Sequence, residues 1–157
     1  MKTLHVVGYK NSGKTTLIAR WIRLLKKEGY TVAVLKHHGH GGPPELPDAS
    51  TDTMQFFESG ADVSVVAGGG IVQLHMNEEP NFLRMKEIAA MQHPDILLIE
   101  GYKEEIGGKV VLLRDETDWD ELQHLSDIQL VLRNMDNERL DSWLLHWAKK
   151  EDGNETV

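Results

Sequence analysis

Short apolar runs alternate with longer amphipathic stretches along the 157 residues. The runs are rich in valine, isoleucine and leucine and predict buried strands of a parallel sheet. They cover residues 4–7, 31–36, 95–101, 109–113 and 128–132. The first amphipathic stretch places Leu17, Trp21, Leu24 and Leu25 on one helical face, with Ile18 and Ile22 beside them. Strands alternating with helices predict an α/β fold in three layers, with helices on both faces of a mostly parallel sheet.

The middle of the chain departs from this alternation. Residues 62–67 and 71–75 read as strands separated only by Gly68-Gly69-Gly70. So short a glycine connection favours an antiparallel hairpin, so we expect a mixed sheet with the hairpin towards one edge. Just before it, Asp52 is placed to cap a helix over 53–58.

The second half of the chain predicts three more helices. One opens at Pro80 or Asn81 and stops near His93-Pro94, and a short one opens at the capping-box pattern of residues 118–121. The last carries an apolar stripe, which we interpret as core packing: Leu140, Trp143, Leu144 and Trp147. We therefore expect one nucleotide-binding domain over residues 1–150 and a frayed acidic tail over residues 151–157.

The bulk composition narrows the classes of function. The chain has no cysteine, which excludes disulfides, zinc–thiolate sites and thiol catalysis. Its formal net charge of −8 argues against general binding to nucleic acid or anionic membranes, which favour a basic surface. No apolar run approaches the length of a membrane span, and residues 1–3 lead directly into the first expected strand. A cytoplasmic location is the expectation.

Residues 8–15 fit the phosphate-loop pattern G-x-x-x-x-G-K-[ST] between a predicted strand and a predicted helix. Gly8 and Gly13 permit the backbone turns that point successive N–H groups at an anion. Lys14 can reach the β- and γ-phosphates of a nucleotide, and the Thr15 hydroxyl can bind Mg²⁺. The residues expected to bind the nucleotide here are Gly8, Lys10, Asn11, Ser12, Gly13, Lys14, Thr15 and Thr16.

A phosphate loop needs a second carboxylate to organise Mg²⁺, usually at the end of an adjacent apolar strand. Glu100 ends the run 95–100 and is the first candidate, against the alternative of a solvated strand-end glutamate. Asp48 and Asp52 are rivals because they follow the second strand on the same edge. The catalytic candidates are therefore Lys14, Asp52 and Glu100.

The segment 37–48 holds three glycines and three prolines and leaves a strand end, so we interpret it as a loop facing a substrate or partner. His37, His38 and His40 are either ligands of a transition metal or polar and phosphate-contacting groups. Lys36 and Lys103 either add positive charge near a phosphate or pterin anion or are surface charges.

The pattern that would recognise the nucleotide base is the weakest of these sequence signals. Arg133-Asn134-Met135-Asp136 follows the last strand where GTP-binding proteins of this class often carry Asn-Lys-x-Asp. Asn134 and Asp136 are candidates for guanine recognition, although Asp136 also fits a cap of the last helix. These motifs leave open a GTP-binding accessory protein, a small-molecule kinase, a metallochaperone GTPase using the His37–His40 loop, or an adaptor without hydrolysis.

Taken together, the chain resembles the molybdopterin-guanine dinucleotide biosynthesis protein B (MobB) family. Four motifs carry this resemblance: the loop 8–16, Lys36-His37-His38, the stretch from Asp52-Thr53 to Ser59-Gly60-Ala61, and Ile99-Glu100-Gly101-Tyr102-Lys103. The sequence departs from the family pattern at Ser50-Thr51, where Gly-Lys is expected, and at Gln55, where a basic residue is common.

The resemblance implies a P-loop protein, usually a homodimer, that binds GTP with Mg²⁺ and hydrolyses it weakly. It implies assistance to the nucleotidyltransferase that attaches GMP to molybdopterin. Lys14 and Thr15 would hold phosphate and Mg²⁺, Glu100 would be the strand-end carboxylate, and Asp52 would belong to the metal or hydrolysis region. Slow turnover is expected because the sequence shows no arginine finger in the loop region.

Overall fold

The computed structural model describes residues 1–39, 42, 44–78, 81–133 and 137–150. The chain forms two compact units, one of Met1–His37 with Phe82–Val157 and the other of His38–Asn81. That residues 1–150 act as a single nucleotide-binding domain stays a prediction.

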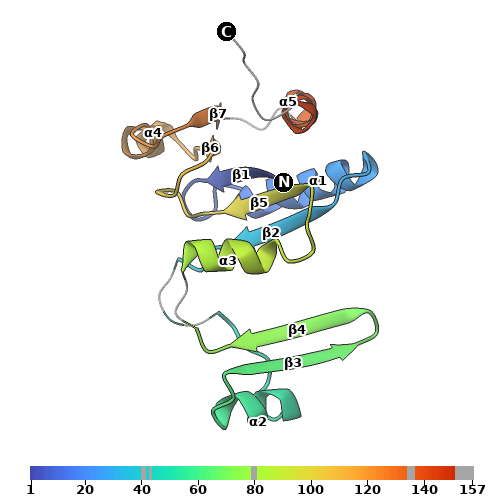
Figure 1. Ribbon diagram of the computed structural model, residues 1–157. Coiled ribbons are helices and arrows are strands. Elements are labelled where there is room, and N and C mark those ends of the chain that lie inside the picture. Colours follow the sequence, from blue (N-terminus) through green and yellow to red (C-terminus); the bar gives the residue numbers. More distant parts are fainter. Residues whose placement is uncertain (40–41, 43, 79–80, 134–136, 151–157) are drawn as a thin grey trace. The chain divides into compact units, whose positions relative to one another are not determined.

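The first unit is built on a five-stranded parallel sheet in the order β2-β5-β1-β6-β7 (Figure 1). Its strands are β1 (Lys2–Val7), β2 (Val32–Lys36), β5 (Ile96–Glu100), β6 (Lys109–Leu112) and β7 (Ile128–Leu132). All five were predicted, and β5 is central and buried as its apolar sequence indicated. The strand order reverses at β1, and such a switch point opens a crevice at the carboxyl ends of the strands, where α/β proteins bind ligands.

Two apolar clusters cover the two faces of this sheet, because successive strand residues point to opposite sides. Val6 belongs to the cluster that packs against α1 (Lys14–Lys27) and α5 (Asn137–Lys149). Val7 belongs to the cluster that includes Leu122 of α4 (Glu116–Leu122). The predicted three-layer α/β architecture is confirmed, and Trp143 and Trp147 pack against the first cluster as expected.

The remaining helix of the first unit, α3 (Phe82–Ala89), contacts β2. It ends before the predicted stop near His93-Pro94, because the chain turns through Ala90–His93. No helix in the described part of the chain combines the length and apolarity needed to span a membrane.

The second unit contains α2 (Asp52–Glu58) and the antiparallel hairpin of β3 (Val63–Gly68) and β4 (Ile71–Met76). The hairpin is confirmed, with Gly69 and Gly70 at φ of +57° and +79°, values that favour glycine. The mixed sheet is not formed, because β3 and β4 pair only with each other in a separate two-stranded sheet. A hairpin completes its inner hydrogen-bond ladder by itself, so local sequence does not decide whether it joins a neighbouring sheet.

Two helix starts differ from prediction. Thr51, not Asp52, precedes α2 in extended conformation, and no side-chain capping bond forms there, so Asp52 is the first helical residue. Helix α4 starts earlier than residue 118, because the Asp115 carboxylate accepts from the backbone N–H groups of Thr117 and Asp118. The Asp118 carboxylate is instead turned towards Arg114.

Candidate phosphate-binding site

The loop between β1 and α1 has the backbone of an anion-binding turn. Gly8, Asn11 and Gly13 have φ of +149°, +64° and +91°, and Gly13 is the N-cap residue that immediately precedes α1. Positive φ alternating with ordinary values turns backbone N–H groups towards a common centre. The helix that follows has 14 residues, and its first N–H groups lack intrahelical acceptors, so its positive end faces that centre.

Gly8 is also required by its neighbours. A Cβ placed there would lie 2.5 Å from the Leu112 carbonyl oxygen and 2.7 Å from Ser12 Oγ. The end of β6 therefore abuts the first residue of the loop. Ser12 Oγ is buried and has no hydrogen-bond partner among the described residues. An unpartnered hydroxyl within this turn fits a loop that completes its hydrogen bonds with a bound oxyanion.

Lys14 folds back over the loop. Its ammonium donates to the carbonyl oxygens of Gly8, at 2.8 Å, and Tyr9, at 2.7 Å. Partial burial lowers the pKa of Lys14 most, the charges of Lys36 and Arg114 lower it further, and Glu100 opposes them. An ammonium held by neutral carbonyls gains energy when phosphate oxygens replace them.

Glu100 lies where the strand-end carboxylate was expected. Its Oε2 accepts a 3.0 Å hydrogen bond from Thr15 Oγ1, and its Oε1 lies 3.5 Å from Lys36 Nζ. The register of the parallel strands brings these groups together, because Glu100 is aligned with Val6 of β1 on one side and with Lys36 of β2 on the other. A hydroxyl and a carboxylate in contact at the start of a phosphate-loop helix fit the oxygen ligands that Mg²⁺ prefers.

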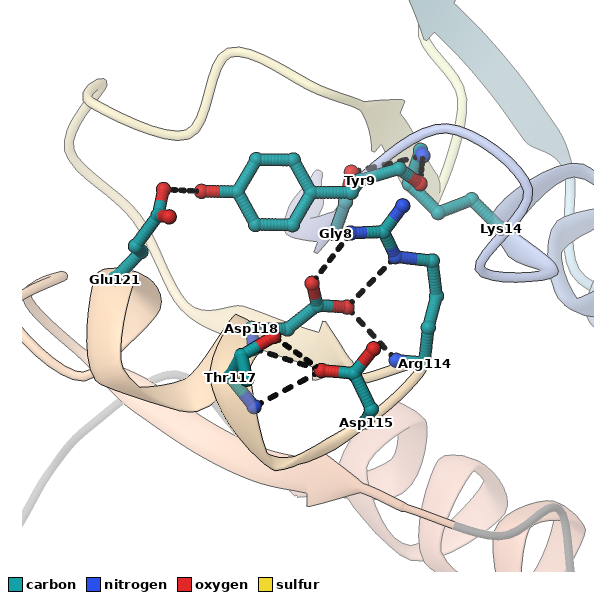
Figure 2. A network of polar contacts seen from close by, with 8 residues as sticks. All are labelled: Gly8, Tyr9, Lys14, Arg114, Asp115, Thr117, Asp118 and Glu121. Atoms are coloured by element: carbon teal, nitrogen blue, oxygen red, sulfur yellow. Dashed lines mark hydrogen bonds and ion pairs between the residues drawn. The ribbon is translucent and has the colours of Figure 1, made fainter.

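A second polar network borders the loop and was missed by sequence reasoning (Figure 2). The Tyr9 hydroxyl donates to Glu121 of α4, and the Arg114 guanidinium lies over the Tyr9 ring, with Cζ 5.0 Å from its centroid. Arg114 is bound by Asp118 through Nε at 2.9 Å and Nη2 at 2.6 Å. Sequence reasoning found no arginine finger in the loop region and did not single out Arg114, which the structure places beside the loop. The signal that would have found Arg114 is its position just beyond the carboxyl end of a parallel strand.

Two more predicted residues of the first unit have defined surroundings. The His37 ring stacks on Tyr102, with centroids 4.6 Å apart, next to the Glu100-Gly101 turn. Lys103 Nζ lies 5.7 Å from the Tyr9 ring centroid, which places this cation beside the phosphate loop, and 3.9 Å from Glu104. Lys10, Asn11, Thr15 and Thr16 are exposed at the loop surface.

The other predicted residues lie elsewhere or outside the description. Asp48, Asp52 and His38 belong to the second unit and are exposed. Asp48 accepts from the Ser50 backbone N–H at 2.8 Å. The guanine candidates Asn134 and Asp136, His40 of the metal hypothesis and the expected tail over residues 151–157 fall outside the described residues. Among those described, no three histidine or acidic side chains gather as a metal site would require.

The five-stranded parallel sheet, the glycine loop at its switch point and the Thr15–Glu100 pair define a phosphate-loop α/β protein. Residues 3–136 match the model of the family described as molybdopterin guanine dinucleotide synthesis protein B. The chain belongs to this MobB family.

Known relatives agree over most of the chain. A probable molybdopterin-guanine dinucleotide biosynthesis adapter protein of Bacillus subtilis is 37% identical over 134 residues, which are 85% of this chain and 78% of that one. The molybdopterin-guanine dinucleotide biosynthesis adapter protein of Escherichia coli is 27% identical, and the match covers 96% of this chain and 95% of that protein. The crystal structure of a MobB homologue from Bacillus stearothermophilus has a TM-score of 0.73 at 32% identity, covering 94% of this chain and 98% of that one. That of Bacillus subtilis MobB has a TM-score of 0.75 at 29% identity, covering 97% and 100%.

Proposed function

We propose that this chain is a GTP-binding adapter in molybdenum cofactor biosynthesis, assisting the nucleotidyltransferase that attaches GMP to molybdopterin. The observation that carries the nucleotide part is the Thr15–Glu100 contact beside Lys14 at the start of α1. The adapter part is supported by the family and by the names of the relatives, which are adapter proteins of this biosynthesis.

The loop supplies the charge that a triphosphate needs. Backbone N–H groups at the start of α1 and the Lys14 ammonium would neutralise phosphate oxygens. Thr15 and Glu100 would hold Mg²⁺, which when bound withdraws charge from the phosphates. Lys36 adds a second cation on the other side of Glu100. Weak hydrolysis with Lys14, Glu100 and Asp52 as its residues, and a cytoplasmic site of action, stay predictions.

The preference for GTP is part of the proposal. Asn134 and Asp136 follow β7, and in the sheet order β7 lies two strands from the phosphate-loop strand. An Asp carboxylate at this position accepts from guanine N1–H and its exocyclic amine, whereas adenine lacks this pair of donors. An Asp136→Asn exchange is therefore expected to reduce discrimination between GTP and ATP.

Calorimetry tests the nucleotide site directly. The wild-type chain is titrated with GTP, ATP, GDP and ADP in the presence of Mg²⁺, and a Lys14→Ala variant is titrated in parallel. We expect GTP to bind most tightly and Lys14→Ala to lose binding while its thermal unfolding stays cooperative. No binding by the wild-type chain, or unchanged binding by Lys14→Ala, would contradict the proposal.

We also propose that the chain is a homodimer whose contact includes the hairpin of β3 and β4. Its strands carry large apolar side chains that are 39–68% exposed, four of them on one face of the hairpin (Val63, Val65, Val72 and Leu74) and two on the other. The two on the other face are Val66 and Ile71. A two-stranded sheet with an exposed apolar face is marginal on its own, and covering that face with the same hairpin of a second copy removes apolar area from water.

The dimer is tested by light scattering after size exclusion. A Val65→Lys/Val72→Lys double variant is expected to run as a monomer, because the lysines would be desolvated at the contact. Matched lysines at exposed Phe56 and Leu83, in a second double variant, are the control for added charge. A wild-type monomer, or a dimer that survives Val65→Lys/Val72→Lys, would rule the hairpin contact out.

A further inference from the structure

Arg114 follows β6, and the carboxyl end of this strand contacts the phosphate loop. The Leu112 carbonyl oxygen would lie 2.5 Å from a Cβ at Gly8, so the backbone of the strand end is in close contact with that of the loop. Two residues later, the Arg114 guanidinium lies over the ring of Tyr9, the residue after Gly8. The neighbourhood of Arg114 and the loop is thus fixed by backbone packing as well as by side chains.

The guanidinium is held in one orientation by a buried carboxylate. The side chain of Asp118 is only 2% exposed, whereas that of Arg114 is 43% exposed. Asp118 accepts from Nε, from Nη2 and from the Arg114 backbone N–H, the last at 2.8 Å. This fork leaves Nη1, which points away from Asp118 in Figure 2 and has no partner among the described residues. The ion pair with Asp118 therefore uses Nε and Nη2 and leaves Nη1 of the partly exposed Arg114 side chain available to a ligand.

Both cationic and acidic side chains lie around the loop, but the Lys14 ammonium hydrogen-bonds to the neutral carbonyls of Gly8 and Tyr9. Lys14, Lys103 and Arg114 lie on or over the loop residues Gly8 and Tyr9, and Lys36 lies across Glu100. The acidic groups facing the same cations are Glu100, Asp118, Glu121 and Glu104. Of these, Asp118 is already paired with Arg114, Glu121 with the Tyr9 hydroxyl, and Glu104 with Lys103. The Lys14 ammonium on neutral carbonyls and the Nη1 group left over from the Asp118 fork therefore fit a phosphate anion at the loop.

We propose that Arg114 is a phosphate-binding residue of the nucleotide site, with Asp118 holding its guanidinium so that Nη1 donates to a phosphate oxygen. This rests on the proposed nucleotide binding and adds a residue outside the loop motif. Arginine suits the task because one edge of its planar fork binds a carboxylate while another nitrogen remains a charged donor. The same chain thereby supplies a cation that other phosphate-loop proteins obtain from an arginine finger.

The experiment compares two arginines held by aspartates in the same way. Arg20 of α1 forks onto Asp141 of α5 at 2.9 and 2.7 Å, away from the loop carbonyls, and serves as the matched control. Wild type, Arg114→Gln and Arg20→Gln are titrated with Mg·GTP and with inorganic tripolyphosphate, and their thermal midpoints are measured. Arg114→Gln is expected to lose about ten- to a hundredfold in affinity for both ligands, and Arg20→Gln to bind like wild type.

Each outcome decides the matter. Wild-type affinity in Arg114→Gln, with binding by the wild-type chain intact, overturns the role of Arg114 and leaves the nucleotide site standing. Absence of both GTP and tripolyphosphate binding in the wild-type chain overturns the nucleotide site and this inference together. Should Arg114→Gln fail to fold, Arg114→Lys replaces it, because a lysine paired with Asp118 keeps that charge pair but lacks the fork. Unchanged tripolyphosphate affinity in Arg114→Lys then overturns the inference.

Discussion

Thr15 donates a 3.0 Å hydrogen bond from its hydroxyl to Oε2 of Glu100, a residue 85 positions further along the chain. The contact joins the first turn of α1 to the carboxyl end of β5. The Thr15–Glu100 hydrogen bond is not part of the apolar core. Thr15 is exposed, and the buried residues of β5 are the four that precede Glu100. The pair is therefore available to exchange its hydrogen bond for a divalent cation without loss of packing.

The first prediction concerns that exchange. Thr15→Val and Glu100→Gln are each expected to weaken GTP binding about tenfold or more in Mg²⁺, because each removes an oxygen ligand or its charge. In EDTA both variants should match the wild-type chain. Glu87→Gln, an exposed change on α3, is the control. Equal losses with and without Mg²⁺ in calorimetry would mean that the pair does not hold the cation.

The second prediction concerns Gly8. Alanine there meets the Leu112 carbonyl at 2.5 Å and adopts a φ of +149° that L-residues rarely take. We expect Gly8→Ala to destabilise the fold by at least about 2 kcal/mol, because the nearest atom is backbone and cannot move aside easily. Gly29→Ala also introduces a positive φ, of +90°, but meets no atom within 4 Å. The free energy of unfolding in urea is measured for both variants. The loss in Gly29→Ala reports the cost of the positive φ alone, and an equal loss in Gly8→Ala would show that the clash with Leu112 adds nothing.

The third prediction concerns Asp118. The Arg114 guanidinium lowers the pKa of this carboxyl from 3.8 to about 2. The unfolded chain therefore binds the proton first, and stabilisation by the ionised pair is complete above pH 3.8 and lost as pH falls towards 2. Asp118→Asn should be clearly less stable than wild type at about pH 5, with the difference shrinking at lower pH. Asp120→Asn, an exposed change on the same helix, controls for acid unfolding in general. A difference that stays constant with pH would refute the coupling.

The fourth prediction concerns His5, which is fully buried in β1. Burial lowers its pKa below 6.5, Lys109 and Lys86 act in the same direction, and the Gly101 carbonyl opposes them from 3.4 Å. As pH falls below 6.5 the unfolded chain takes up the proton first, so the folded state loses stability. His5→Gln should flatten this part of the pH dependence of the thermal midpoint, whereas exposed His124→Gln should retain it. The same slope in His5→Gln and wild type would contradict this.

Much of this molecule follows from local sequence. Apolar runs specified all seven strands, the glycine loop specified its own turn, and the stripes on α1 and α5 specified which side chains are buried. These features depend on periods of two and 3.6 residues and on glycine's access to positive φ, which act within a few residues. Glu100 was identified because an apolar strand followed by a carboxylate is itself a local signal.

The tertiary structure decided what depends on residues far apart in the chain. The hairpin of β3 and β4 forms its own sheet instead of joining the parallel one, and Arg114 lies over Tyr9, 105 positions earlier in the chain, because β6 pairs with β1. Local patterns carry no information on which strand edges meet, because backbone hydrogen bonding is the same for every partner. The sequence by itself therefore determined the phosphate loop, and strand order determined which cations surround it.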